Sequence, residues 1–283
     1  MNSIMKLNSF TGGVWGEKAI LTIPTGPTYE EIFLETNLTP AQIKRVSITL
    51  NAEEIIVLDG ELMKALEAYK GMPAASGFYH IPLADITAKT KNGMRYTSLV
   101  TEQGDNITLE VEIVDKPAAD SPDVQLKGHA TVSPGQPARI VVPMIQKQTM
   151  QASSTENEFL DLKSGPLIHI RRLHFLNNEV NGLEIHKDYV KLYDSTRSVE
   201  TMRAKRNKRF WQAGVFHFDP IMRGTEIPDR PRIAIGPCDQ PSQTTNRARP
   251  AQRHEVILNC QHRWRVDSRT GKDPLDQLAT FGQ

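Results

Sequence analysis

The stretch Ile107-Thr-Leu-Glu-Val-Glu-Ile113 alternates between apolar and polar side chains at every position. Successive side chains of a β-strand point to opposite faces of the sheet, so this period of two places the aliphatic residues together on one face. The opposite face carries one threonine and two glutamates. The stretch therefore predicts a β-strand that buries one face in a core and turns the other toward water.

Shorter runs of the same kind lie on the N-terminal side of this strand. Ile43–Leu50 alternates in the same way, and Glu54–Leu58 ends in Asp59-Gly60, which is a strong turn signal. Many short strands separated by glycine and proline turns are typical of sandwiches and barrels, and about eight strands in each half fit a jelly roll. We expect an all-β protein of two tandem eight-stranded jelly rolls, each with a short helix.

The order of elements occurs twice along the chain. Glu61–Lys70 and Ser195–Arg206 each show the spacing of apolar residues that is typical of a helix. A strand that contains a glycine, an aromatic residue and a histidine follows each helix, at Gly77–Leu83 and at Gly214–Ile221. A long loop and an alternating strand then complete each half. This repeated plan indicates two domains of one architecture.

The segment Lys116–Asp123 has the composition of a linker, with two prolines and small polar residues between two strand-like runs. The predicted domains are therefore an N-terminal jelly roll at residues 1–119 and a C-terminal jelly roll at residues 120–283. The second domain contains a long proline-rich loop near residues 223–253 with little periodicity. In a compact domain, so long a loop is usually functional or mobile.

The composition argues against several classes of protein. The 283 residues carry a formal net charge of +1, which gives no global attraction for nucleic acid or acidic membranes. Cys238 and Cys260 form no paired-cysteine motif, so neither a disulfide framework nor a zinc cage is expected. No apolar run is long enough to span a membrane, and Met1–Gly16 lacks the pattern of a signal peptide. We expect synthesis and folding in a cytoplasm.

The N-terminal region carries several short motifs in a defined order. They are Leu7-Asn8-Ser9, Ile20-Leu-Thr-Ile-Pro24, Gly26-Pro27-Thr28-Tyr29-Glu30, Ile32-Phe-Leu34 and Thr39-Pro40-Ala41-Gln42-Ile43-Lys44. In this combination the region resembles the major capsid protein of corticoviruses and related tailless, membrane-containing marine phages. Beyond it, the resemblance rests on the plan of strands and on the overall length.

The resemblance implies a structural subunit without catalytic activity. Its homotrimers would form pseudo-hexagonal capsomers of an icosahedral shell around a lipid membrane, which in turn surrounds a double-stranded DNA genome. The implied partners are neighbouring capsomers, penton and minor membrane proteins, and the surface of the inner membrane. Direct contact with nucleic acid is not expected, because the membrane lies between shell and genome. The implied location is the virion capsid, assembled in the cytoplasm of a bacterial host.

Asp115, Asp120 and Asp123 cluster in and beside the expected linker. Carboxylate oxygens are ligands that calcium prefers, and oxygen-rich loops can bind this ion. These aspartates lack the fixed spacing of a known calcium loop, so a solvated linker is the alternative. Structural calcium is therefore a hypothesis, and no other cofactor is expected.

The densest run of positive charge is Arg203-Ala-Lys205-Arg206-Asn-Lys208-Arg209-Phe-Trp211. Cations beside aromatic rings can bind nucleic acid or lipid headgroups. Cations also gather at the C-terminal ends of helices, where the helix dipole favours them. Contacts between subunits or with the membrane are one interpretation, and the solvated end of a helix is the other. The candidate contact residues are Arg203, Lys205, Arg206, Lys208 and Arg209.

The sequence shows no convergent set of catalytic groups. Glu110 and Glu112 share one face of the strand at 107–113, where carboxylates are solvated far more often than they act as acid and base. His80 and His217 occupy matching places in the two halves, and packed, hydrogen-bonded histidines are expected there. A jelly-roll hydrolase would need convergent carboxylates or a metal site.

The alternative function is that of a β-sandwich carbohydrate-binding protein, such as a receptor-binding spike. That function would need an exposed platform of aromatic side chains. Trp15, Trp211 and Trp264 do not cluster in the sequence. The capsid interpretation is therefore preferred.

Overall fold

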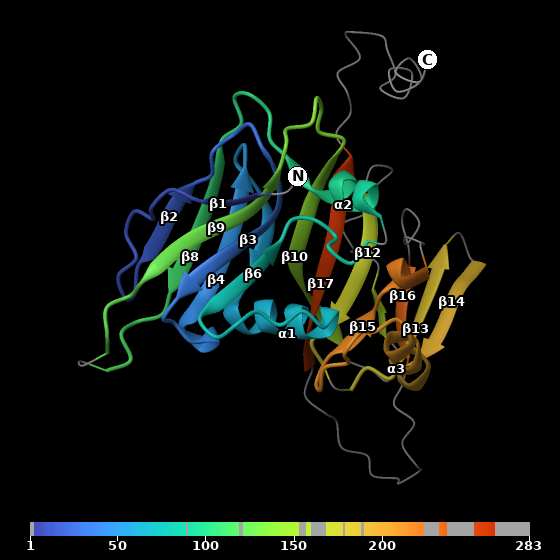
Figure 1. The fold of residues 1–283 in the computed structure, drawn as a ribbon. Helices are drawn as coiled ribbons and strands as arrows, with labels where there is room; N and C mark the ends of the chain where they lie inside the picture. Colours follow the sequence, from blue (N-terminus) through green and yellow to red (C-terminus); the bar gives the residue numbers. More distant parts are fainter. Residues whose placement is uncertain are drawn as a thin grey trace, which may run out of the picture.

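The computed structural model describes residues 3–88, 90–118, 121–152, 157–159, 168–177, 179–187, 190–223, 232–236 and 252–263. Within these ranges the chain is mostly β-strand, with short helices beside the sheets (Figure 1). Among the helices of this part of the chain, none is long and apolar enough to cross a membrane.

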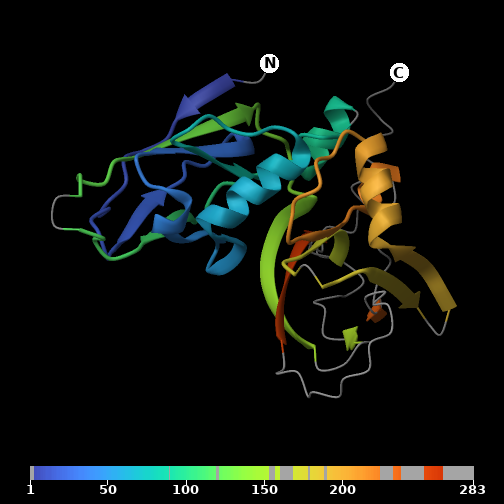
Figure 2. The ribbon, with the colours of Figure 1, turned by 90° about the horizontal axis from the view of Figure 1, so that it is seen from below.

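The first half of the chain forms two facing sheets (Figures 1 and 2). Its strands are β1 (Ser3–Lys6), β2 (Lys18–Thr22), β3 (Thr28–Thr36), β4 (Ile43–Leu50), β5 (Glu53–Leu58), β6 (Phe78–Pro82), β7 (Leu99–Val100), β8 (Ile107–Ile113) and β9 (Leu126–Ser133). One sheet has the order β1-β9-β3-β6, with β7 also paired to β3, and the other has the order β2-β8-β4-β5. The strictly alternating stretch at 107–113 is therefore a central strand, as its pattern predicts.

The second half forms a second pair of sheets from the strands that follow. They are β10 (Val141–Ala152), β11 (Asn157–Phe159), β12 (Ile168–Phe175), β13 (Gly182–Lys187), β14 (Val190–Thr196), β15 (Phe216–Phe218), β16 (Arg232–Gly236) and β17 (Gln252–Arg263). One sheet has the order β10-β17-β12-β15, and the other has the order β11-β16-β13-β14.

The two halves have the same strand order. When the strands of each half are counted along the chain, with β7 left aside, one sheet runs first-eighth-third-sixth and the other runs second-seventh-fourth-fifth. A helix joins the fifth strand to the sixth in each half, α1 (Gly60–Lys70) in the first and α3 (Arg197–Arg206) in the second. The chain is thus a double jelly roll with a helix beside each roll, which confirms the predicted fold class.

One continuous sheet joins the two rolls. β5 and β10 pair in parallel at Ile56 and Ile145, so a single eight-stranded sheet runs β2-β8-β4-β5-β10-β17-β12-β15. Both isoleucines are buried. Rotating one roll against the other would disrupt this parallel pairing, because the backbone hydrogen bonds of a sheet need the two strands side by side in register. The shared sheet therefore restricts the angle between the rolls.

The aliphatic residues of β8 show how alternation builds the core. They are at most 2% exposed, and burying one such side chain contributes about 1.5–3 kcal/mol. On the outer face, Glu110 lies 3.9 Å from Lys18 and Glu112 lies 2.8 Å from Lys44. The two glutamates are therefore paired surface residues of a strand, in agreement with their solvated interpretation.

The Gly26–Glu30 motif forms the turn into β3. Gly26 has a φ of 117°, a conformation that glycine adopts without steric penalty. The Thr101 hydroxyl accepts a hydrogen bond from the Gly26 amide at 2.7 Å and donates one to the Pro27 carbonyl at 2.7 Å. The Tyr29 hydroxyl donates to the Pro24 carbonyl at 2.6 Å, and burial raises the pKa of Tyr29 to about 12. The residues that carry the family resemblance here are structural.

The strand pairing places the boundary between the rolls later than the expected one at residues 119 and 120. β9 pairs with both β1 and β3, so the loop at 116–123 joins two strands of the same roll. The passage between rolls lies between Ser133 and Val141. Proline and small polar residues suit a long connection between strands as well as a linker between domains, which explains the difference.

The connections contain short elements that the sequence pattern does not predict. α2 (Lys91–Thr97) precedes β7, and the Thr90 hydroxyl caps it by accepting a hydrogen bond from the Gly93 amide at 3.1 Å. β16 lies inside the segment expected as a proline-rich loop near 223–253. Residues 224–231 and 237–251 of that segment lie outside the described residues. The loop is therefore interrupted by a strand of the second roll.

Candidate functional site

The C-terminal end of α1 reaches from the first roll to the second (Figure 1). The Phe210 amide donates a hydrogen bond to the Tyr69 carbonyl at 2.9 Å. Gly71 ends the helix with a φ of 70°, and a Cβ at this position would lie 2.6 Å from the Phe210 ring. Only glycine permits this close approach in this conformation. The helix end thereby brings Tyr69 and Lys70 into the contact between the rolls.

Replacing Gly71 by Ala is expected to lower the free energy of unfolding by about 2–5 kcal/mol. A left-handed backbone costs an L-residue about 1–2 kcal/mol, and the clash with Phe210 adds an overpacking cost of about 1–3 kcal/mol. Gly104→Ala is the matched control, because Gly104 has a φ of 92° and no atom within 4 Å of its Cβ position. Urea unfolding measures both variants. Equal losses would show that the Phe210 contact contributes nothing.

Two aspartates and three arginines form a buried cluster of ion pairs next to this helix end. Asp85, from the loop after β6, lies 2.7 Å from Arg171 and 3.1 Å from Arg172 of β12. Arg172 Nε also lies 3.0 Å from Asp219, and Arg209 lies 3.7 Å from the same carboxylate. All five side chains are at most 11% exposed. Arg172 therefore links a carboxylate of the first roll to one of the second.

The aspartates and arginines of the cluster stabilise one another's charged forms. Burial alone would raise the pKa of Asp85, but the charges of Arg172 and Arg171 outweigh burial and hold the pKa well below its usual range. Burial would lower the pKa of Arg172, whereas Asp219 and Asp85 raise it above its ordinary value. Attraction between buried charges is largely offset by their desolvation, but a separated buried charge is very unfavourable. The cluster therefore favours one relative placement of the two rolls.

His174 of β12 and His217 of β15 share a hydrogen bond beside this cluster, with their Nδ1 atoms 2.7 Å apart. Tyr69 stacks on His217 with a distance of 4.1 Å between ring centroids. One Nδ1 donates and the other accepts, so the two rings cannot both be protonated there. Burial, with repulsion from Arg172 and Lys70, lowers the pKa of His174 to about 3. Burial and the neighbouring His174 lower the pKa of His217 to about 2.

The basic run of the sequence divides into buried and exposed residues. Arg203 is 6% exposed, lies 2.8 Å from Glu200 and stacks over the Tyr193 ring. Arg209 belongs to the ion-pair cluster described above. These two arginines are engaged with side chains of their own subunit, and their role as contact residues stays a prediction. The exposed cations of the run are Lys205, Arg206 and Lys208.

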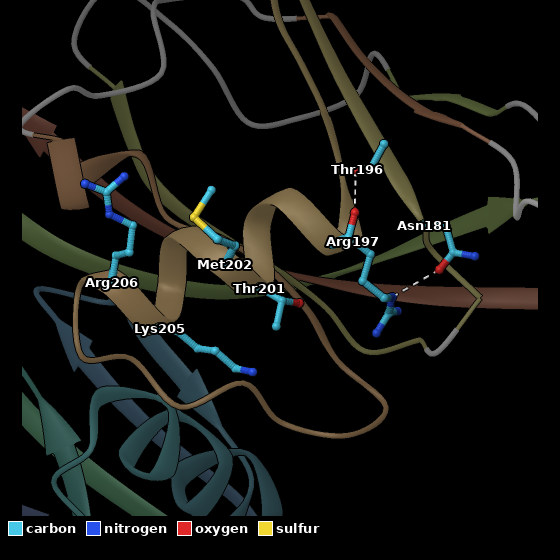
Figure 3. A pocket seen from close by; sticks show the side chains of 8 residues that line it. Asn181, Thr196, Arg197, Thr201, Met202, Lys205 and Arg206 are labelled. Atoms are coloured by element: carbon cyan, nitrogen blue, oxygen red, sulfur yellow. Dashed lines mark hydrogen bonds between the residues drawn. The ribbon is translucent and has the colours of Figure 1, made fainter.

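A shallow pocket lies on the outer face of α3 beside two of these cations (Figure 3). Its volume is about 750 Å³, and α3 and the residues next to it supply most of its lining. Arg197 is turned toward Asn181, whose side-chain oxygen accepts a hydrogen bond from Arg197 Nε at 3.1 Å. Met202 is 47% exposed, with Lys205 and Arg206 one turn further along the helix. Methionine and arginine are enriched at protein interfaces, so this face suits a contact surface.

Of the three aspartates considered as calcium ligands, Asp115 and Asp123 lie in the described part of the chain. Asp115 lies beside Gly16, and the Asp123 carbonyl accepts a hydrogen bond from the Asn37 side chain at 2.9 Å. Asp120 lies outside the described residues. In those residues, no group of three His, Cys, Asp or Glu side chains is arranged to hold a metal ion. Calcium binding stays a prediction that rests on residue type alone.

The fold and the buried centre together define a class of protein. Two rolls of identical strand order are fused through one sheet and fastened by a cluster of ion pairs. This is the architecture of a double jelly-roll viral coat protein. The charges of the ion-pair cluster are paired with one another. The cluster therefore acts as a structural link between the two rolls.

Family models confirm the class and supply the family. Residues 4–133 match the viral coat protein P2 N-terminal domain, and residues 142–230 match the viral coat protein P2 C-terminal domain. The chain belongs to the viral coat protein P2 family. The change from one model to the other coincides with the passage between rolls after β9.

Solved structures show the same fold. The major capsid protein P2 from bacteriophage PM2 is 20% identical, with a TM-score of 0.80 over 94% of this chain and 99% of that one. The structure of Sulfolobus turreted icosahedral virus contains a chain that is 10% identical, with a TM-score of 0.64 over 99% of this chain and 95% of that one. A chain of the PBCV-1 virus capsid is 12% identical, with a TM-score of 0.54 over 100% of this chain and 88% of that one. No curated protein sequence matches this chain.

Proposed function

We propose that this coat protein assembles as homotrimers, which form the pseudo-hexagonal capsomers of an icosahedral phage shell. The observation that carries the proposal is the identical strand order of the two rolls. Three such subunits arranged around a threefold axis place six similar rolls in a ring. Closed rotational symmetry of this kind is usual for homo-oligomers. Six similar rolls in a ring approximate a hexagon, which tiles a surface.

The likeness to the PM2 protein supports the finer parts of the proposal. That protein is the major capsid protein of a bacteriophage, and it matches this chain over nearly the full length of both. By this analogy, the shell encloses an internal membrane around double-stranded DNA, and assembly takes place in the cytoplasm of a bacterial host. The proposed partners are neighbouring capsomers, penton and minor membrane proteins, and the inner membrane surface. The proposed role includes no catalysis.

The restricted angle between the rolls supports a tiling function. A tile transmits stress only when its parts keep their relative positions. Here the shared sheet and the buried ion pairs both oppose movement between the rolls. The exposed cationic face of α3 is the proposed contact with a neighbouring subunit, carried by Lys205, Arg206 and Lys208.

The mass of the purified protein in solution tests the proposal. The monomer has a mass of 31.8 kDa, and light scattering is expected to give three times this value, with or without added calcium. A trimer that forms only with calcium would support the aspartates as ligands. Electron microscopy of the trimers is expected to show a hexagonal outline.

A strict monomer at every concentration would contradict the capsomer proposal. In that case, binding to a glycan array would test the carbohydrate-binding alternative.

Charge reversal at Lys205 and Arg206 is expected to reduce the trimer fraction, or the packing between trimers, without changing the stability of the monomer.

A further inference from the structure

A small cavity lies between the two rolls, next to the ion-pair cluster. Its volume is about 20 Å³. Since about 10–15 Å³ suffices for one water-sized particle, the cavity has room for a single small species. Its lining comes from both rolls and consists of Lys70, Pro82, Leu83, Ala84, Asp85, Pro143, Arg171 and Arg172.

The lining carries an excess of positive charge, with three cations and one carboxylate. That carboxylate, Asp85, is already in ion pairs with Arg171 and Arg172. In the described part of the chain, no hydrogen bond or ion pair holds the ammonium group of Lys70, although Lys70 is only 7% exposed. Because three cations line this small space against one carboxylate, a negative charge in the cavity would stabilise the folded state.

The electrostatic surroundings of Lys70 also favour an anion in the cavity. Burial, followed by repulsion from Arg172, lowers the pKa of Lys70 to about 8. Asp85 and Asp219 act in the opposite direction but do not restore the ordinary value. At neutral pH Lys70 is still mostly protonated, so its charge must be accommodated between the rolls. An anion beside it would oppose both the burial penalty and the repulsion.

We propose that this cavity binds one halide ion, with chloride as the natural occupant, between Lys70 of α1 and the arginines of β12. The size of the cavity restricts the ligand to a monatomic species, and its charge requires an anion. Because α1 belongs to the first roll and β12 to the second, the ion acts as a further link between rolls. The proposal concerns the stability of the subunit and does not depend on how the subunits assemble.

Thermal unfolding of the full chain in different sodium salts tests the site. At constant pH and ionic strength, the Tm is expected to rise with the concentration of chloride or bromide, because a ligand that binds only the folded state stabilises it. Gluconate is too large for the cavity and is expected to give no rise. Lys70→Met keeps the apolar stem but removes the charge, and is expected to abolish the halide dependence. Lys205→Met, on the exposed face of α3, is expected to retain it.

Crystals grown in sodium bromide give a direct readout. An anomalous peak is expected within hydrogen-bond distance of Lys70 Nζ. Lys70→Met is expected to fold, because no ion pair of the described residues is lost and the cost of burying the ammonium charge is removed. If it fails to fold, the bromide peak in the unaltered protein decides the matter.

Two outcomes would overturn the proposal. One is equal Tm values in chloride, bromide and gluconate with no bromide peak, which would leave a water molecule as the occupant. The other is a halide dependence that persists in full in Lys70→Met, because the stabilisation would then arise elsewhere. Neither outcome bears on trimer formation, which light scattering measures separately.

Discussion

Replacing Arg172 by Met is expected to lower the free energy of unfolding by about 3–5 kcal/mol. Arg172 is 2% exposed and lies within 3.1 Å of carboxylates from both rolls. Methionine fills a similar volume, so the loss would come mainly from the charges of Asp85 and Asp219 that remain buried. Removing one partner of a buried pair is far more costly than replacing the whole pair by apolar residues.

Arg45→Met is the matched control for this variant. Arg45 also contacts a carboxylate, Glu54, at 2.7 Å, but the two side chains are 40% and 46% exposed. Exposed ion pairs typically contribute about 0–1 kcal/mol, so this change is expected to be nearly neutral. Equilibrium unfolding in urea at neutral pH measures both. Similar small losses in the two variants would show that the inter-roll cluster does not hold the rolls together.

Acidification is expected to destabilise the protein well before its carboxylates titrate. The pKa values of His174 and His217 are about 3 and about 2 in the folded state, against an ordinary value of 6.5. Below pH 6.5 the unfolded chain therefore binds protons that the folded chain excludes, so stability falls as the pH falls. The slope of the free energy of unfolding against pH is expected to reach about 1.4 kcal/mol per pH unit for each histidine. Below about pH 4 the carboxylates also contribute.

The variant His217→Asn isolates this effect. Asparagine places an amide group near the position of Nδ1 but does not titrate, so the slope of stability against pH is expected to fall by about half. His186→Asn is the control, because His186 is 26% exposed and pairs with Glu184 on the surface. The urea midpoint, measured at a series of pH values, gives the slopes. An unchanged slope in His217→Asn would mean that the buried pair is not the source of acid sensitivity.

Local patterns were sufficient to predict most of the elements. The expected strands at 43–50 and 107–113 are β4 and β8, and the expected helix at 61–70 is α1 with one further residue. The two strands with a glycine, an aromatic residue and a histidine are β6 and β15, and each is the sixth strand of its roll. Such predictions succeed because period and turn residues act over a few neighbours.

The histidines of those two strands have different partners. His80 lies 2.8 Å from Glu31 of the first roll, whereas His217 bonds to another histidine. Both are packed and hydrogen-bonded, as expected from their matching places. Their different chemistry follows from the third strand of each roll, which carries Glu31 in one case and His174 in the other. Strand pairing, not local sequence, selects these partners.

The charged centre was not predictable in the same way. Asp85, Arg172 and Asp219 are far apart in the sequence, and single charged residues carry no periodic signal. One local signal was available in the basic run, because Glu200 lies three residues before Arg203 on the same face of a helix. That spacing places the two side chains together, and it distinguishes the inward Arg203 from the outward Lys205.

The amino-acid sequence by itself determined the all-β class, the doubled plan and the structural character of the N-terminal motifs, because alternation, turn residues and helix caps act locally. Only the tertiary structure decided where one roll ends, which cations are buried, and that Lys70 and Arg172 meet between the rolls. These features depend on β5 pairing with β10 and on the docking of α1. Both contacts join residues distant in the chain, so no local pattern of sequence carries a signal of them.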